Sequence, residues 1–334
     1  MIAPRFWASA RPGILARGLA PLGALYGLAT ATRMGRLGAR VDAPVICVGN
    51  YVLGGAGKTP TAIAVARLLL NAGERVAFLS RGYGGARRAA PTRVDPQMHG
   101  ALGVGDEPLL LARVAPCWVG VDRVAAAREA IAEGASVLVL DDGLQNPSLA
   151  KDYSLAVIDG EAGFGNGFCF PAGPLRAPPA RQARFVSAEV AIGGMDAPAS
   201  ALPPGRSIFR AHLEADAIVG AELVGRPVLA FAGIARPEKF YATLEGLGAQ
   251  IAARRQFADH HSYDPKEIDE IVAIARRRGL TAVTTEKDYV RLTAAQRLMV
   301  RALPVTLRFE APERVATALS AALQARRLDG RAQR

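Results

Sequence analysis

The stretch from Pro44 to Pro60 constrains the fold of this chain more than any other segment. An apolar run over 45–48 is typical of a buried strand, and the apolar segment 61–70 predicts a helix. Between them the sequence reads Gly-Gly-Ala-Gly-Lys-Thr. Glycines let backbone N–H groups converge on an anion, and the N-terminus of the following helix adds its positive dipole end. We therefore expect this loop to bind a nucleoside triphosphate.

Each residue type in the loop predicts a separate contact. Lys58 would reach the β- and γ-phosphates, and the Thr59 hydroxyl would bind Mg²⁺. Val52 stands where the usual pattern has its first glycine, so the loop is a variant form. The backbone that surrounds the phosphates would come from Gly54, Gly55, Ala56 and Gly57.

A second apolar run, from Ala135 to Leu140, ends in Asp141 and Asp142. An Asp-Gly turn that closes a strand is the simpler interpretation of this segment alone. A buried strand that ends in Asp is also the arrangement that holds Mg²⁺ beside a phosphate-binding loop. Because such a loop is present at 54–59, we favour the metal site.

Other polar residues also follow predicted strands. Arg81 comes directly after the strand 75–80, at the end of an open sheet where ligands bind, although it could be a surface arginine in a glycine turn. Asp106 and Glu107 begin a helix, and spacing alone favours a helix cap over a catalytic role. His260 and His261 follow the strand 250–257 beside Asp259, whose carboxylate could orient and charge an imidazole, although ordinary turn residues are the simpler interpretation.

The order of the elements predicts an α/β fold: a doubly wound, mostly parallel sheet of the P-loop NTPase type with a second, smaller α/β lobe. We expect the larger domain at 41–215 and the smaller lobe at 216–334. Residues 1–40 read as a basic amphipathic helix, which could lie on a membrane interface or pack on the core.

The net charge of +11 suggests an anionic partner: nucleic acid, anionic lipid or a phosphorylated substrate. The three cysteines have no spacing typical of a zinc site or a disulfide framework, which favours a reducing compartment.

Taken together, the motifs of the chain resemble those of the tetraacyldisaccharide 4′-kinase family, in the same order and over nearly the whole length. They are Gly49-Asn50, Gly54-Gly55-x-Gly57-Lys58-Thr59-Pro60, Ser80-Arg81-Gly82-Tyr83, Gly105-Asp106-Glu107-Pro108, Leu140-Asp141-Asp142-Gly143-x-Gln145 and Phe257-x-Asp259-His260.

The resemblance implies a kinase that transfers the γ-phosphate of ATP to the 4′-hydroxyl of a tetraacylated glucosamine disaccharide 1-phosphate, giving lipid IVA in lipid A biosynthesis. Asp106 would be the general base and His260 its partner, with Lys58 on the transferred phosphate and Arg81 as a further phosphate contact. The magnesium ion would be surrounded by Thr59, Glu107, Asp141 and Asp142.

The resemblance further implies a monomer bound to an anionic membrane, at the cytoplasmic face of the bacterial inner membrane, and it removes nucleic acid as a partner. The first helix then becomes an interface anchor. An acid that commonly follows the Leu-Arg pair of the family is replaced by Ala177, so its role is not carried over. The alternative is a nucleotide-switched ATPase or GTPase of the partitioning or metallochaperone type, which would have no sugar acceptor.

Overall fold

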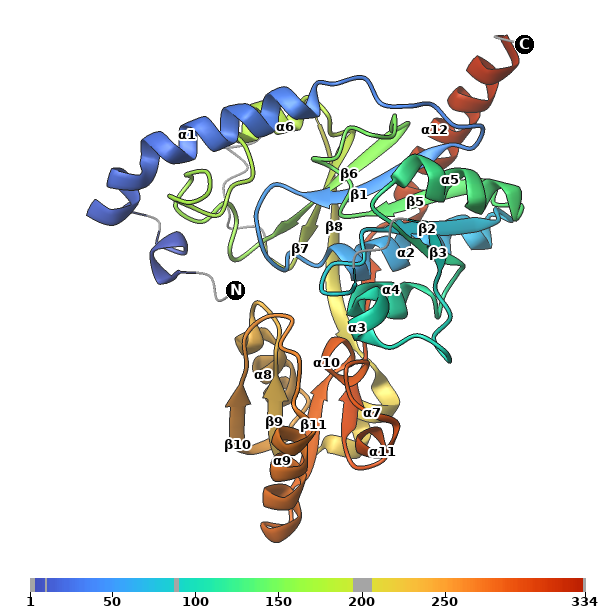
Figure 1. The fold of residues 1–334 in the computed structure, drawn as a ribbon. Coiled ribbons are helices and arrows are strands. Elements are labelled where there is room, and N and C mark those ends of the chain that lie inside the picture. The colour runs from blue at the N-terminus through green and yellow to red at the C-terminus, as the bar shows by residue number, and fades with distance from the viewer. Residues whose placement is uncertain (1–3, 10, 87–89, 195–205, 333–334) are drawn as a thin grey trace.

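The structure, a computed structural model, describes residues 4–9, 11–86, 90–194 and 206–332, which form two lobes (Figure 1). The larger lobe is built on a nine-stranded sheet in the order β13-β8-β7-β6-β1-β5-β2-β4-β3. Its neighbouring strands are parallel, except that β13 is antiparallel to β8 and β3 to β4. The strands are β1 (Val45–Asn50), β2 (Val76–Ser80), β3 (Thr92–Arg93), β4 (Cys117–Val119), β5 (Val137–Asp141), β6 (Tyr153–Asp159), β7 (Ala188–Ile192), β8 (Ser207–Ala215) and β13 (Val305–Phe309).

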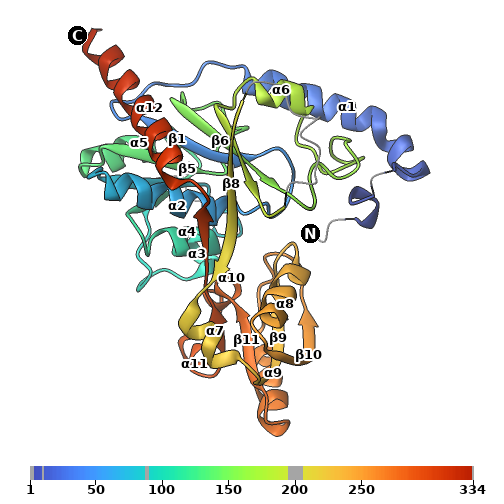
Figure 2. The same ribbon diagram turned by 180° about the vertical axis from the view of Figure 1, so that it is seen from behind.

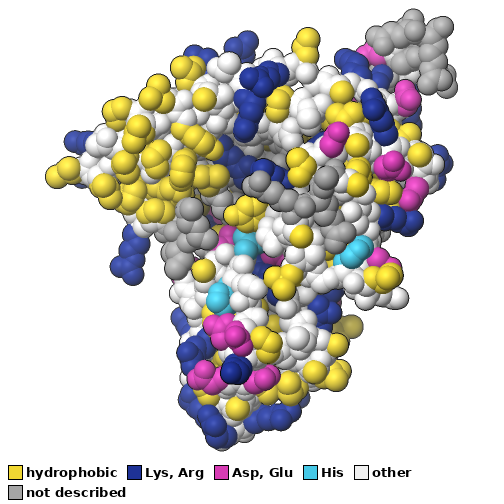
Figure 3. Space-filling view, in the orientation of Figure 1, with side chains coloured by type: hydrophobic (Ala, Val, Ile, Leu, Met, Phe, Trp, Pro, Cys, Tyr) yellow, Lys and Arg dark blue, Asp and Glu magenta, His cyan; other side chains and the backbone are white. Residues whose placement is uncertain are grey.

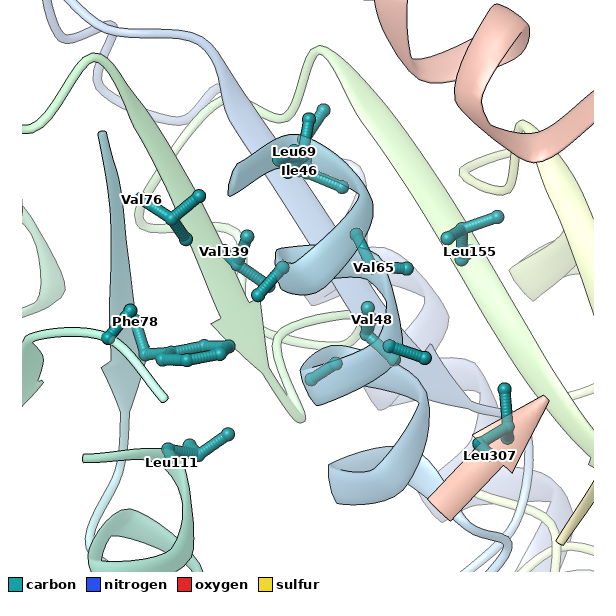
Figure 4. Packing of buried hydrophobic residues seen from close by; sticks show 14 of the residues in the cluster. Ile46, Val48, Val65, Leu69, Val76, Phe78, Leu111, Val139, Leu155 and Leu307 are labelled. Carbon is teal, nitrogen blue, oxygen red and sulfur yellow. The ribbon is translucent and has the colours of Figure 1, made fainter. Parts of the chain in front are cut away.

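Helices cover both faces of this sheet, which is why its central strands are apolar without alternation. On one face, Ile46, Val48 and Val139 point toward Val65 and Leu69 (Figure 4). The helices on this face are α2 (Lys58–Asn71), α4 (Asp106–Leu111) and α12 (Pro312–Ala332). The opposite face is covered by the end of α1 (Ile14–Met34), by α5 (Arg123–Ala132) and by α6 (Pro179–Ala183). The fold class predicted from the sequence is thus confirmed.

The first helix, α1, follows a short 3-10 helix, η1 (Arg5–Trp7), and turns small residues toward the protein. A Cβ at Gly23 would lie 2.6 Å from the Cys169 carbonyl oxygen, and one at Gly27 would lie 2.7 Å from Cys169 Sγ. Large apolar side chains therefore remain on the outside, where they form the apolar surface in Figure 3. They are Ile14 (92% exposed), Leu15 (60%), Leu22 (56%), Leu25 (66%), Tyr26 (36%) and Leu28 (49%). By length and composition alone, α1 is also long and apolar enough to cross a membrane.

The smaller lobe contains a parallel four-stranded sheet in the order β10-β9-β11-β12. Its strands are β9 (Pro227–Ala232), β10 (Gln250–Gln256), β11 (Thr281–Thr285) and β12 (Arg301–Leu303). Helices α7 (Ala217–Leu223) and α8 (Pro237–Gly246) pack on one face, and α9 (Pro265–Arg277) on the other. Short helices complete the elements: α3 (Ala101–Val104) in the larger lobe, and α10 (Glu286–Tyr289) and α11 (Ala294–Arg297) in the smaller one.

Two paired strands connect the lobes. The chain leaves the large sheet through β8 and returns through β13, and Val305 faces Ala215 across this antiparallel pair (Figure 2). Helix α12 then packs on α2, and Arg326 donates a hydrogen bond to the Val41 carbonyl oxygen. The smaller lobe therefore ends near residue 304, whereas the sequence suggested a lobe over 216–334. Strand and helix alternation does not say which of two sheets a returning strand joins.

Candidate active site

The glycine loop connects β1 to α2 in a backbone shape that requires glycine at two positions. Gly54 has a φ of 102° and Gly57 a φ of 85°, both in the left-handed region. Lys58 begins α2 and is 9% exposed. Its ammonium group donates to the Gly54 carbonyl oxygen over 3.2 Å and lies 3.9 Å from Asp142 Oδ2. The loop thus curls around its own lysine at the carboxyl end of the central strand.

Asp141 ends the neighbouring strand β5, where it stands opposite Val48 of β1, and Asp142 follows it directly. The Thr59 hydroxyl donates to Asp141 Oδ2 over 3.1 Å. Asp142 has a φ of 55°, and its Oδ2 accepts a hydrogen bond of 2.9 Å from Arg176 Nη2. The second carboxylate oxygen of each aspartate, Oδ1, is buried and accepts no hydrogen bond within the described residues. Buried oxygens of this kind are open to a further ligand.

The two carboxylates differ in their preferred charge. Burial raises the pKa of Asp141 to about 7, and repulsion from Glu107 and Asp142 adds to the effect of burial. Burial acts on Asp142 as well, but attraction to Arg176 and Lys58 outweighs it and lowers the pKa of Asp142 to about 2. Asp142 is therefore the permanently charged member of the pair.

Asp106 opens α4 and is 3% exposed. Its Oδ1 accepts the backbone N–H of Glu107 over 2.8 Å. Its Oδ2 faces His260 Nδ1 at 3.1 Å and accepts from Arg291, over 2.9 Å from Nε and also from Nη2. Burial opposes ionisation, yet the His260 hydrogen bond and the charges of Lys287 and Arg291 hold the pKa of Asp106 well below its usual range.

The two histidines separate into different environments. His260 has a φ of 58° and lies against the Tyr83 ring, with 4.9 Å between the ring centroids. His261 instead stacks on Phe257 at 4.8 Å, with its Nε2 at 2.8 Å from Glu267 Oε2. Of the pair, the structure brings only His260 to Asp106.

One short segment of the smaller lobe links this cluster to the glycine loop. The Gly233 carbonyl oxygen accepts from Arg291 Nη1 over 3.0 Å and from the His260 backbone N–H over 3.2 Å. Two residues later, the Ala235 Cβ lies 3.5 Å from the position that a Cβ on Gly55 would take. Because successive Cα atoms are only about 3.8 Å apart, the Asp106 cluster and the glycine loop lie close together where the two lobes meet.

Arg81 is not brought into this cluster. It lies exposed after β2, and its guanidinium group makes no hydrogen bond or ion pair with any described residue. Ala177, which stands where the family commonly has an acid, is fully buried.

Three basic residues of the site carried no functional prediction from the sequence. Arg176 lies in a proline-rich segment and holds Asp142. Lys287 and Arg291 belong to a segment whose local pattern indicates only a helix cap, since Thr285 accepts the Asp288 backbone N–H. Lys287 Nζ lies 3.2 Å from Glu107 Oε1, so the smaller lobe also contacts the second acid of α4. The chain has only five lysines, and this scarcity was the one feature of the sequence that could have marked Lys287 as functional.

Comparison with known proteins gives consistent matches over nearly the whole chain. The family model described as tetraacyldisaccharide-1-P 4′-kinase matches residues 15–324. The tetraacyldisaccharide 4′-kinase of Methylobacterium sp. (strain 4-46) is 56% identical over 311 residues, covering 92% of this chain and 93% of that protein. The protein of the same name from Gluconacetobacter diazotrophicus is 50% identical over 319 residues, covering 94% and 97%.

A solved structure has the same fold. It is described as the apo form of LpxK from Aquifex aeolicus in complex with ATP, and it superposes with a TM-score of 0.71 at 24% sequence identity. The alignment covers 93% of this chain and 100% of that one.

Proposed function

The chain belongs to the tetraacyldisaccharide 4′-kinase family, and from this premise we propose that ATP and an acylated disaccharide 1-phosphate come together where its two lobes meet. It is a kinase of lipid A biosynthesis, which transfers a phosphate to the 4′-hydroxyl of its substrate. The observation that carries the assignment of the site is the link through Gly233 and Ala235, because it joins a carboxylate to a phosphate-binding loop.

We assign the triphosphate to the glycine loop. The backbone of residues 54–57 would surround the β- and γ-phosphates, and Lys58 would exchange its contact with the Gly54 carbonyl oxygen for one with phosphate oxygen. The ATP named in the Aquifex aeolicus structure supports this assignment. Arg81 is free to swing onto a phosphate, since it is exposed and unpaired within the described chain.

The residues beside the loop fit a magnesium ion. Mg²⁺ prefers oxygen ligands and takes most of them from water and phosphate, so a few protein oxygens suffice. Asp141 and Asp142 each offer a buried, unpartnered Oδ1, and the Thr59 hydroxyl lies beside them. Within the described part of the chain no set of three or more His, Cys, Asp and Glu side chains is arranged as a metal site. When bound, the ion would neutralise charge on the phosphates.

We place Glu107 near the magnesium ion but not among its direct ligands. It acts on Asp141 electrostatically, but its Oε1 is already paired with Lys287 at 3.2 Å. The Asp pair is therefore the stronger choice for direct ligation.

Asp106 is our choice for the base that receives the proton of the sugar hydroxyl. Its Oδ2 is saturated by Arg291 and His260, whereas Oδ1 accepts only one backbone N–H and can accept the hydroxyl as well. Its low pKa makes it a weak base. In phosphoryl transfer the bond to the leaving group is largely broken in the transition state, so a positioned weak base is sufficient.

The apolar outer face of α1 fits a lipid partner. We infer that α1 inserts into the interface of the inner membrane from the cytoplasmic side, and that a monomer meets its acylated substrate there. The net charge of +11 would favour an anionic leaflet.

The decisive assay combines the purified full chain with labelled ATP and the disaccharide 1-phosphate in detergent. We expect label on the lipid, and we expect Asp106→Ala to abolish transfer while ATP binding stays near normal. Hydrolysis of ATP without lipid labelling would support the nucleotide-switch alternative instead. Loss of ATP binding in Asp106→Ala would contradict the assignment of the base.

A further inference from the structure

Lys287 lies at the centre of the contact between the lobes, and the mechanism above gives it no task. It is carried by the short helix α10, and its side chain is 21% exposed. Its Nζ is 3.2 Å from His260 Nε2 and 3.2 Å from Glu107 Oε1, and it lies 3.7 Å from Asp259 Oδ1. Among the residues that the structure describes, the ammonium group is thus the one positive charge that contacts the outer nitrogen of His260.

These contacts determine where the proton of His260 resides. An ammonium group can only donate hydrogen bonds, so His260 Nε2 must act as an acceptor and carries no hydrogen. On the other side of the ring, Nδ1 faces the carboxylate of Asp106 at 3.1 Å, and a carboxylate can only accept. A neutral ring with its single hydrogen on Nδ1 satisfies both contacts.

The carboxylates near the ring favour a second proton on it. Asp106 faces Nδ1, and Asp259 Oδ2 lies 3.8 Å from Nε2. The Tyr83 ring packs edge-on, and Arg291 contacts the ring only through the carboxylate that both share. Two carboxylates around an imidazole stabilise its charged form. Two cations oppose the carboxylates: Arg291, which acts through the shared carboxylate, and Lys287, which contacts the ring nitrogen directly.

We propose that Lys287 is a positioning residue that holds His260 as a neutral imidazole, with its proton on Nδ1 and directed to Asp106. The proposal rests on the transfer reaction proposed above. Because Nδ1 already carries a hydrogen, it cannot receive the proton that Asp106 takes from the sugar hydroxyl. His260 therefore orients the Asp106 carboxylate through a neutral hydrogen bond, and the hydroxyl proton stays on Asp106.

The direct test is the protonation state of His260 in the full chain. The protein contains four histidines, so ¹⁵N-histidine labelling gives a simple spectrum, in which His260→Gln identifies the signal. Two-bond ¹H–¹⁵N correlation spectra distinguish the three states of an imidazole ring. At neutral pH we expect the wild type to show His260 neutral and protonated on Nδ1. A wild-type ring that is protonated on Nε2, or on both nitrogens, would overturn the proposal without any variant.

Three lysine variants test whether a positive charge at residue 287 sets the protonation state of His260. Lys287→Met removes the ammonium group, and we expect His260 to become doubly protonated between Asp106 and Asp259. Lys287→Arg keeps a cationic donor and should retain the wild-type pattern. Lys266→Met, an exposed lysine of α9 in the same lobe, is the matched control and should change nothing. An unchanged His260 signal in a folded Lys287→Met protein would refute the proposal.

Kinetics give a second readout. We expect Lys287→Met to lower kcat for transfer by about 10–100-fold with the KM for ATP changed less than about two-fold, since the glycine loop is untouched. If kcat fell and the KM for ATP rose by the same factor, Lys287 would be merely structural, which would count against the proposal. If the wild type labelled no disaccharide, the proposed function would fail, yet the His260 spectra would still decide the role of Lys287.

Discussion

Replacing Arg291 by glutamine tests the contact between the lobes most severely. The Arg291 and Asp106 side chains are 6% and 3% exposed, and Arg291 also pairs with the fully buried Asp288 over 2.9 Å. The substitution leaves two buried carboxylates without their shared cation. Breaking a buried ion pair by removing one partner costs about 3–5 kcal/mol, because the remaining charge stays desolvated. We expect the free energy of unfolding to fall by about this amount.

The same chain offers a matched control. Arg301 pairs with Glu222 in the same lobe, but their side chains are 46% and 45% exposed. An exposed pair contributes about 0–1 kcal/mol, so Arg301→Gln should be nearly neutral. In thermal unfolding, an entropy of about 2.1 cal/mol/K per residue corresponds to about 1.4 °C per kcal/mol for 334 residues, so the Arg291 variant should lose roughly 4–7 °C and the control at most about 1.5 °C.

A double-mutant cycle identifies the source of the loss. In an Asp106→Asn background the carboxylate charge is already absent, so Arg291→Gln should cost less than in the wild type, by at least about 1 kcal/mol. Urea unfolding of the four proteins supplies the free energies. Additive losses, or a cost for Arg291→Gln equal to that for Arg301→Gln, would refute a buried Arg291–Asp106 pair.

Three further outcomes follow from other parts of the structure. Replacing Leu22 and Leu25 by glutamate should abolish co-sedimentation with anionic vesicles, whereas glutamate at the even more exposed Leu298 of the smaller lobe should leave it unchanged. Gly57→Ala should weaken nucleotide binding by about 5- to 150-fold in a filter assay, roughly 1–3 kcal/mol, because φ is 85° there and the new Cβ would lie 2.5 Å from a side-chain atom. Because the folded pKa of Asp106 is depressed, its stabilising effect is complete above the ordinary pKa of about 4 and is lost as pH falls through the folded value, so acid unfolding should be steeper in the wild type than in Asp106→Asn.

The parts of the site that directly follow a buried strand could be located from the sequence. The loop at 54–59 and the acids at 141–142 each follow a buried strand, and the carboxyl ends of neighbouring parallel strands necessarily meet. The alternation of strands and helices predicted the fold class, and the order of the motifs predicted the family. Both predictions are confirmed.

The parts that depend on docking of the lobes were not predictable from the residues alone. Arg291 contacts Asp106 across 185 positions, and Lys287 contacts Glu107 across 180. Their local sequence satisfies a helix cap, so nothing nearby signals a second task. Likewise, apolar periodicity identified α1 as a helix but could not show that its small residues face inward and its large ones outward.

The antiparallel pairing of β8 with β13 makes the smaller lobe an insertion in the larger one, and the two ends of the insertion lie side by side. Since Val305 stands opposite Ala215, an ordinary two-residue hairpin could close the large sheet in its absence. Within the described residues, the side chains that hydrogen-bond the Asp106 carboxylate come from this insertion, whereas the glycine loop lies outside it. Under the proposed mechanism, binding of the phosphate donor and positioning of Asp106 would thus be encoded by separate stretches of the sequence.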